Sequence, residues 1–131
     1  MSASEKVLVL LVDDCDETRQ MYAEVLSAKF EVAQASTARE ALAKASELLP
    51  SAIVMDLVLP DMDGKDAILR LRRDARTGQI PVVVLSGSVE PAGKTPPWDG
   101  FLAKPFPPDA LRAYLDRMIT RAAAAYPGAA V

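Results

Sequence analysis

Short, mainly apolar runs recur at regular intervals along the chain, and this pattern limits the fold more than any other feature of the sequence. The strongest run, Val7–Val12, has six apolar residues in succession and no alternation with polar residues. Runs of this kind are typical of strands that are buried on both faces, as in a parallel sheet. The pattern predicts five strands, at 7–12, 30–35, 52–55, 81–85 and 100–103.

Segments with helical spacing of apolar residues separate these strands. Asp16 is the expected N-cap of the first helix, and Thr37 with Glu40 forms a capping box before the second. The core face of the first helix is expected to hold Met21, Tyr22, Val25 and Leu26. A third helix passes through 67–71 and ends at 77–78, and a last helix opens at 107–109. The alternation of strand and helix predicts an α/β doubly wound sheet with right-handed crossovers.

The composition fits one globular domain. The 131 residues are half apolar and carry 15 basic and 18 acidic side chains, for a net charge of −3. This length is near the commonest domain size. Residues 1–131 are therefore expected to form a single domain, with a core at about 6–122 and a C-terminal tail at 123–131.

Missing residue types exclude several kinds of chemistry. The sequence contains no histidine and one cysteine, Cys15, which excludes a Ser-His-Asp triad, a histidine metal site, an intrachain disulfide and a thiolate zinc cage. The acidic balance and the few aromatic residues argue against direct nucleic-acid binding. The run at 7–12 is too short for a secretory or membrane segment, so we expect a cytoplasmic protein without membrane contact.

Polar residues directly follow four of the predicted strands. The first strand ends in Asp13-Asp14, the third in Asp56, the fourth in Ser86 and the fifth in Lys104. The carboxyl ends of parallel strands meet at one edge of the sheet, where ligands bind at the switch point of strand order. Three carboxylates brought together there repel one another and need a cation. Because the ligands are all oxygen, Mg²⁺ or Mn²⁺ is the expected ion.

Lys104 and Ser86 complete an arrangement that is suited to a phosphoryl group. The lysine supplies a fixed positive charge and the serine a hydroxyl donor beside Asp56. A cation, an ammonium and a hydroxyl together stabilise the oxygens of a phosphoryl group during transfer. A carboxylate in this setting can attack phosphorus and form an aspartyl phosphate.

This set of residues resembles the receiver domain of bacterial two-component response regulators. The matching segments, in chain order, are Asp13-Asp14, Asp56 to Gly64, Ser86 and Lys104-Pro105-Phe106. The resemblance implies a flavodoxin-like, five-stranded parallel sheet of order 2-1-3-4-5. It also implies a phosphoacceptor switch in a two-component phosphorelay, not an enzyme that turns over a separate substrate.

The resemblance assigns roles in metal binding and phosphorylation. Asp56 would be the phosphoacceptor. Asp14, Asp56 and the backbone carbonyl of Val58 would ligate Mg²⁺ directly, and Asp13 would hold the ion through water. Lys104 would pair with the phosphoryl oxygens.

Further roles that the resemblance implies lie around the fourth and fifth strands. The Lys104–Pro105 peptide bond would be cis, and Ser86 would hydrogen-bond a phosphoryl oxygen. Phe101 stands at the position of the family's aromatic switch residue, although an apolar anchor for a short strand explains it equally well. The implied partners are a sensor histidine kinase or a histidine phosphotransfer protein as phosphodonor and an unknown downstream protein, and a homodimer stays open.

One segment departs from the family pattern. Receivers usually carry a fourth helix between the hydroxyl residue and the fifth strand, but this interval contains Pro91, Pro96 and Pro97. A proline in a helix interior costs about 3 kcal/mol, so we expect a short helix or a proline-rich loop. Trp98 is expected to cover this loop instead of serving as an exposed anchor for a partner.

Two other functions stay open at this point. One is an interaction module of receiver shape that is never phosphorylated, although clustered carboxylates then have no purpose. The other is a Mg²⁺-dependent phosphohydrolase that works through an aspartyl phosphate. Within the switch interpretation, Val58 and Ser88 flank the acceptor and neither can act as a charged base, which predicts slow self-dephosphorylation.

Overall fold

Five parallel strands form one sheet in the order β2-β1-β3-β4-β5. The computed structural model describes residues 6–87 and 97–125. The strands are β1 (Leu8–Val12), β2 (Glu31–Ala35), β3 (Ala52–Asp56), β4 (Val82–Ser86) and β5 (Gly100–Ala103). Each differs from its predicted range by no more than one residue at either end, and the predicted doubly wound, flavodoxin-like order is confirmed.

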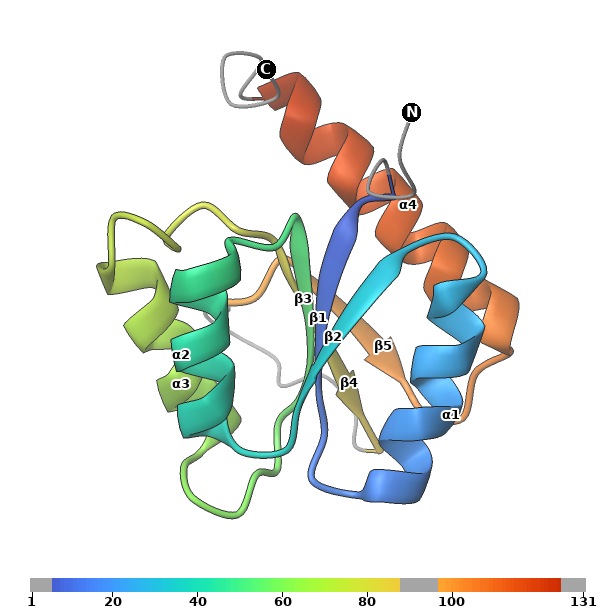
Figure 1. Ribbon diagram of the computed structural model, residues 1–131, viewed down its shortest axis with the longest axis horizontal. Helices are drawn as coiled ribbons and strands as arrows, with labels where there is room; N and C mark the ends of the chain where they lie inside the picture. Colours follow the sequence, from blue (N-terminus) through green and yellow to red (C-terminus); the bar gives the residue numbers. More distant parts are fainter. Residues whose placement is uncertain (1–5, 88–96, 126–131) are drawn as a thin grey trace.

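Helices cover both faces of this sheet. Helices α1 (Asp16–Ser27) and α4 (Pro108–Ala125) lie on one face, and α2 (Ala38–Leu48) and α3 (Gly64–Arg73) lie on the other (Figure 1). None of the described helices is long and apolar enough to cross a membrane.

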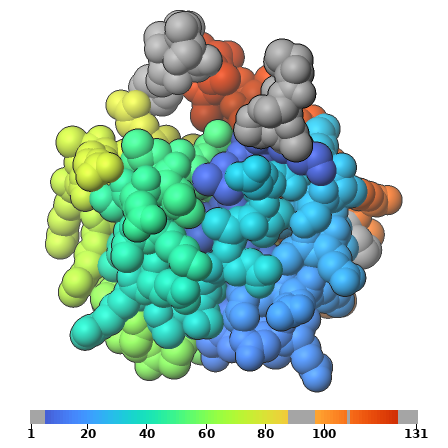
Figure 2. All heavy atoms as spheres, viewed as in Figure 1, coloured from blue at the N-terminus to red at the C-terminus, as the bar shows by residue number. Residues whose placement is uncertain are grey.

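Alternating side chains of the central strands build the two halves of the core. Leu10, Ile53 and Val84 belong to the cluster that includes residues of α2 and α3. Leu11 and Val54 belong to the cluster that includes residues of α1 and α4. Figure 2 shows the edge at β2, where the strand's atoms fill the space between α1 and α2. Burial on both faces explains why β1, β3 and β4 have no polar alternation.

Two helix ends differ from the sequence prediction. The N-cap of α1 is Cys15, and Asp16 is the first helical residue, because the turn before it is closed by the Asp13 side chain, which accepts from the Cys15 amide at 2.9 Å. Helix α3 ends at Arg73, not at 77–78. Asp74 has an extended backbone there, and its side chain accepts from the Arg76 amide, which starts a turn.

The N-terminus of α2 is capped from two directions. Thr37 accepts from the Glu40 amide at 3.1 Å as expected, whereas the Glu40 carboxylate binds the amide of Ser36 and not that of Thr37. Asp61, from the loop after β3, accepts from the amides of Ala38 and Arg39. These two backbone hydrogen bonds lower the pKa of the Asp61 carboxyl. The loop that follows Asp56 is therefore hydrogen-bonded to the N-terminus of α2 through Asp61.

The proline-rich interval between β4 and β5 falls largely on residues 88–96, which lie outside the described residues, so its conformation stays a prediction. Trp98 at its end is buried, packs in the core cluster on the α2/α3 side and contacts Phe101 at 6.2 Å between ring centroids. It is therefore not an exposed anchor. Met21, expected in the core, is half exposed.

Candidate functional site

Three carboxylates meet at the carboxyl edge of the sheet. Asp13 and Asp14 follow β1, and Asp56 ends β3, the neighbouring strand. One carboxylate oxygen from each lies within 4.8 Å of the others. The strand order brings these side chains together, since β1 and β3 are adjacent although 42 residues separate Asp14 from Asp56 (56 − 14). The convergence expected from the sequence is confirmed for these three residues.

Asp56 is held by one contact on each carboxylate oxygen. Its Oδ1 accepts from the Val58 amide at 3.0 Å, and its Oδ2 lies 3.3 Å from the Lys104 ammonium. The Asp56 side chain keeps 18% of its surface exposed. The carboxylate is thus oriented and still open to a reactant.

Asp13 is the most deeply buried of the three acids, with 3% of its surface exposed. Burial raises the pKa of its carboxyl, the hydrogen bond from Cys15 opposes this, and the negative charge of Asp56 raises the pKa further. A buried carboxylate that faces other carboxylates is costly in free energy. Such a group is stabilised by a nearby cation.

Lys104 reaches this cluster from the end of β5. Its amide donates to the Ser86 carbonyl at 2.8 Å, and the Lys104–Pro105 peptide bond is cis, the geometry that the resemblance implied. Phe106 then stacks on Tyr22 of α1 at 5.6 Å between ring centroids. The strand pairing and this aromatic contact fix the segment that carries the lysine.

Ser86 and Phe101 lie on the neighbouring strands β4 and β5. Ser86 is buried at the end of β4, directly after Leu85, the residue that pairs with Asp56. Phe101 is half buried and packs against the α2/α3 core cluster. Val58 follows Asp56 closely, with 77% of its surface exposed.

The loop between Asp56 and α3 requires its glycine. The Gly64 amide donates to the Leu57 carbonyl at 2.9 Å. A Cβ at Gly64 would lie 2.8 Å from Leu57 backbone atoms, closer than such contacts allow. This close approach holds the loop, including Val58, against the start of α3.

Two residues near the site were not predicted to act there. Helical spacing predicts Tyr22 in the core, and it is buried. Burial also raises the pKa of its phenol, and the charges of Lys104, Asp13 and Asp56 act on it. Arg19 binds the backbone of Asp13. In the sequence, the one feature that relates Arg19 to the site is its position five residues after Asp14. This spacing does not predict a contact with the Asp13 backbone unless the fold is known.

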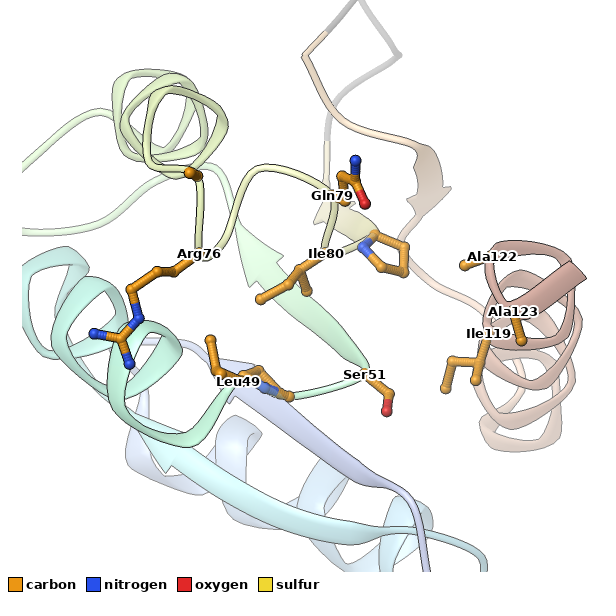
Figure 3. A pocket seen from close by; sticks show the side chains of 11 residues that line it. Leu49, Ser51, Arg76, Gln79, Ile80, Ile119, Ala122 and Ala123 are labelled. Atoms are coloured by element: carbon orange, nitrogen blue, oxygen red, sulfur yellow. The ribbon is translucent and has the colours of Figure 1, made fainter. Parts of the chain in front are cut away.

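A separate hollow lies at the opposite edge of the sheet. Figure 3 shows it between Leu49, Ser51, Ile80 and Ile119, where the amino ends of β3 and β4 meet α4. Among the lining residues that the structure describes, Arg76 alone is charged. It lacks the acidic groups of the carboxyl edge and is not a candidate for the same chemistry.

The donor set of the carboxyl edge fits a hard divalent cation. Three carboxylate groups supply oxygen ligands within 4.8 Å of one another, and thiol or imidazole ligands do not enter the cluster. Oxygen ligands of this kind suit Mg²⁺. The acidic cluster with a lysine on one carboxylate, at the carboxyl edge of a doubly wound sheet, defines the class as a flavodoxin-like α/β domain with a candidate metal centre.

Comparison with known proteins identifies the family. Residues 9–116 match the response regulator receiver domain, and the chain belongs to this family, whose members are signalling switches and not classical enzymes. The chain is 33% identical over 124 residues to response regulator Rre1 of Synechocystis sp., covering 90% of this chain. It is 37% identical over 87 residues, 64% of this chain, to response regulator protein VraR of Staphylococcus aureus.

Solved structures agree with this assignment. Chemotaxis response regulator CheY4 of Vibrio cholerae has a TM-score of 0.74 and 32% identity, with 86% of this chain and 98% of that chain covered. The curated relatives are longer: the chain spans 54% of the length of Rre1 and 41% of that of VraR.

Proposed function

We propose that Asp56 is the phosphoacceptor of this receiver domain and that its phosphorylation requires Mg²⁺, with Mn²⁺ as a substitute. The observation that carries the proposal is the position of Asp56, whose two oxygens face the Lys104 ammonium at 3.3 Å and the Val58 amide at 3.0 Å beside two further carboxylates. A module used only for protein contact has no need of such clustered charge.

The chemical step is an in-line transfer of the phosphoryl group. An Asp56 oxygen forms a bond to phosphorus while the bond from phosphorus to the donor atom breaks and its electron pair leaves with the donor. With a phosphohistidine donor whose second ring nitrogen carries a proton, the imidazole takes the electron pair of the P–N bond and leaves as a neutral group. Lys104 stabilises the negative charge on the transferring oxygens.

In this proposal Asp14, Asp56 and the Val58 carbonyl would hold Mg²⁺ directly, and Asp13 would hold it through water. The ion, when bound, supplies positive charge that offsets the carboxylates and the incoming phosphoryl oxygens. Ser86 donates its hydroxyl to a phosphoryl oxygen after transfer. The burial of Asp13 and the short distances within the acidic cluster support this assignment.

The signal is proposed to leave through β4, β5 and α4. Phosphorylation adds about −1.5 to −2 charges and draws Ser86 and Lys104 toward Asp56. Phe101, which pairs with Val84 two residues before Ser86 and contacts the buried Trp98, then changes its packing. This shift alters the surface that a downstream protein, or a second copy of the chain, contacts.

The phosphodonor is proposed to be a sensor histidine kinase or a histidine phosphotransfer protein. These 131 residues contain no histidine, so they cannot carry the donor group themselves. Residues 1–131 are proposed to act in the cytoplasm as a single receiver unit, without direct contact with nucleic acid or membrane.

Intact mass measurement tests the phosphoacceptor. We expect the chain, incubated with Mg²⁺ and a small acyl phosphate, to gain the mass of one phosphoryl group. Asp56→Asn removes the nucleophilic oxygen and should abolish the gain, whereas Asp66→Asn, an exposed acid on α3, should leave it unchanged. Chelation of Mg²⁺ should slow the gain strongly.

Two results would contradict the proposal. A chain that gains no phosphoryl group from a small donor or from any histidine kinase would be an interaction module only. Continuous release of phosphate from a soluble phosphate ester would instead indicate a phosphohydrolase.

A further inference from the structure

The turn after β1 must hold a fixed shape if the proposed function is correct, because Asp13 and Asp14 supply two of the three carboxylates. Strand pairing fixes the Asp13 amide, which donates to the Ala35 carbonyl at 3.1 Å. The Asp13 side chain accepts from the Cys15 amide at 2.9 Å. The peptide group that joins Asp13 to Asp14 lies between these two contacts.

Arg19 binds that peptide group. Its Nη1 donates to the Asp13 carbonyl at 2.8 Å. Its Nε donates to Oε1 of Gln34 on β2 at 2.9 Å, and its Nη2 donates to Asp16 at the start of α1 at 2.7 Å. One guanidinium thus joins the end of β1, the neighbouring strand and the first turn of α1.

The Arg19 side chain is largely buried, and its three hydrogen-bond acceptors lie on ordered elements of the fold. The Arg19 side chain keeps only 12% of its surface exposed. The backbone of Gln34 is held in turn, since its main-chain carbonyl accepts from the Lys44 ammonium. A planar guanidinium with several donors at fixed angles can serve three acceptors at once, which a single ammonium cannot do in the same geometry.

Arg19 acts on the cluster through the backbone. The guanidinium is bonded to the Asp13 carbonyl oxygen and not to its carboxylate. Its effect on the site is therefore the orientation of the turn.

We propose that Arg19 is a positioning residue that holds the Asp13–Asp14 peptide in the orientation in which the acidic cluster receives Mg²⁺. This role rests on the proposed function. It does not involve contact between Arg19 and the ion. Partners that orient metal ligands in this way typically change metal affinity by about 10- to 100-fold when they are removed.

Mg²⁺ titration by calorimetry on the folded chain tests this role. Arg19→Gln and Arg19→Lys should each weaken Mg²⁺ binding about 10-fold or more, because neither side chain can serve all three acceptors. Arg39→Gln, an exposed charge-matched control on α2, should leave the Kd unchanged. Urea unfolding in metal-free buffer measures the stability of each variant separately.

A milder variant covers the case in which the Arg19 variants do not fold. Gln34→Met removes the acceptor of Arg19 Nε while the Asp13 contact stays, and it should weaken Mg²⁺ binding in the same direction by a smaller factor.

The outcomes separate this role from the proposed function. If Arg19→Gln folds and its Kd for Mg²⁺ is unchanged, the role of Arg19 is overturned, while the proposed function stands. If the Arg19 variants do not fold, an unchanged Kd in Gln34→Met leads to the same conclusion. A loss of stability without a change in Kd would show a purely structural contact. A wild-type chain that binds no Mg²⁺ would overturn the proposed function together with this role.

Discussion

Single residues around Asp56 differ in what they can offer to a phosphoryl group. Lys104 supplies charge, and the Val58 amide supplies a hydrogen bond. The Val58 side chain, which is 77% exposed next to these groups, supplies neither a base nor a hydrogen bond to water. Hydrolysis of the phosphorylated residue needs an oriented water, so this position affects how long the signal lasts.

Slow loss of the phosphoryl group is the prediction at this scale. After removal of the donor, intact mass followed over time at neutral pH should show a phosphoryl half-life much longer than seconds. Val58→Asn, whose amide can orient water, should speed the loss several-fold, whereas Val58→Leu should not. A wild-type half-life of only seconds would contradict the argument. The second flanking residue of the hypothesis, Ser88, lies outside the described residues.

Among the elements, the segment that leads into β5 is fixed by one side chain of α3. Arg72 donates to the carbonyls of Ile80 at 2.7 Å and Pro97 at 3.1 Å, and it pairs with Asp99. Asp99 also accepts from the Val82 amide at 2.8 Å. Arg72 therefore connects α3, the turn before β4 and the residues on either side of the buried Trp98.

Removal of this connection should destabilise the fold. Arg72→Met leaves backbone carbonyls without their donor in partly buried positions, and it should lower the free energy of unfolding by about 2–3 kcal/mol. Urea unfolding measures this change. Arg73→Met is the matched control, because Arg73 is the next residue and is exposed; it should change stability by less than about 0.5 kcal/mol. Equal effects of the two variants would show that the Arg72 contacts contribute nothing.

At this scale, the spacing of apolar residues predicts the positions of strands and helices, but it does not predict contacts between side chains and the backbone of other segments. Buried runs such as Val7–Val12 are too short for a helix, are rich in β-branched residues and are bounded by polar residues, so strand positions and their polar ends could be predicted. The sequence pattern predicts a longer α3 than the one observed, which ends at Arg73, because the Asp74 turn competes with helical pairing. The capping of α2 by Asp61 and the binding of Asp13 by Arg19 link residues that no local pattern relates.

For the whole molecule, folding creates electrostatic repulsion at the candidate site. In the unfolded chain Asp56 is far from the adjacent residues Asp13 and Asp14, whereas in the folded chain one carboxylate oxygen of each lies within 4.8 Å of the others. Of these three acids, Asp56 alone contacts Lys104, whose ammonium lies 3.3 Å from the Asp56 Oδ2. A bound divalent ion stabilises the folded state alone, because the unfolded chain does not assemble the three ligands.

Loss of one carboxylate charge should therefore preserve or raise the free energy of unfolding without Mg²⁺ and should lower the stabilisation that Mg²⁺ provides. At Mg²⁺ concentrations near 100 times the Kd, the wild-type chain should gain about 2.7 kcal/mol over its value in chelator. Asp14→Asn removes one repulsive charge, so its stability in chelator should equal or exceed that of the wild type, while its gain with Mg²⁺ should largely disappear. Asp66→Asn, an exposed acid outside the cluster, should keep the full gain. Thermal or urea unfolding of the three chains in both buffers gives the comparison. If Asp14→Asn lowered stability in chelator and kept the Mg²⁺ gain, the carboxylate would have a structural role and the ion would be held elsewhere.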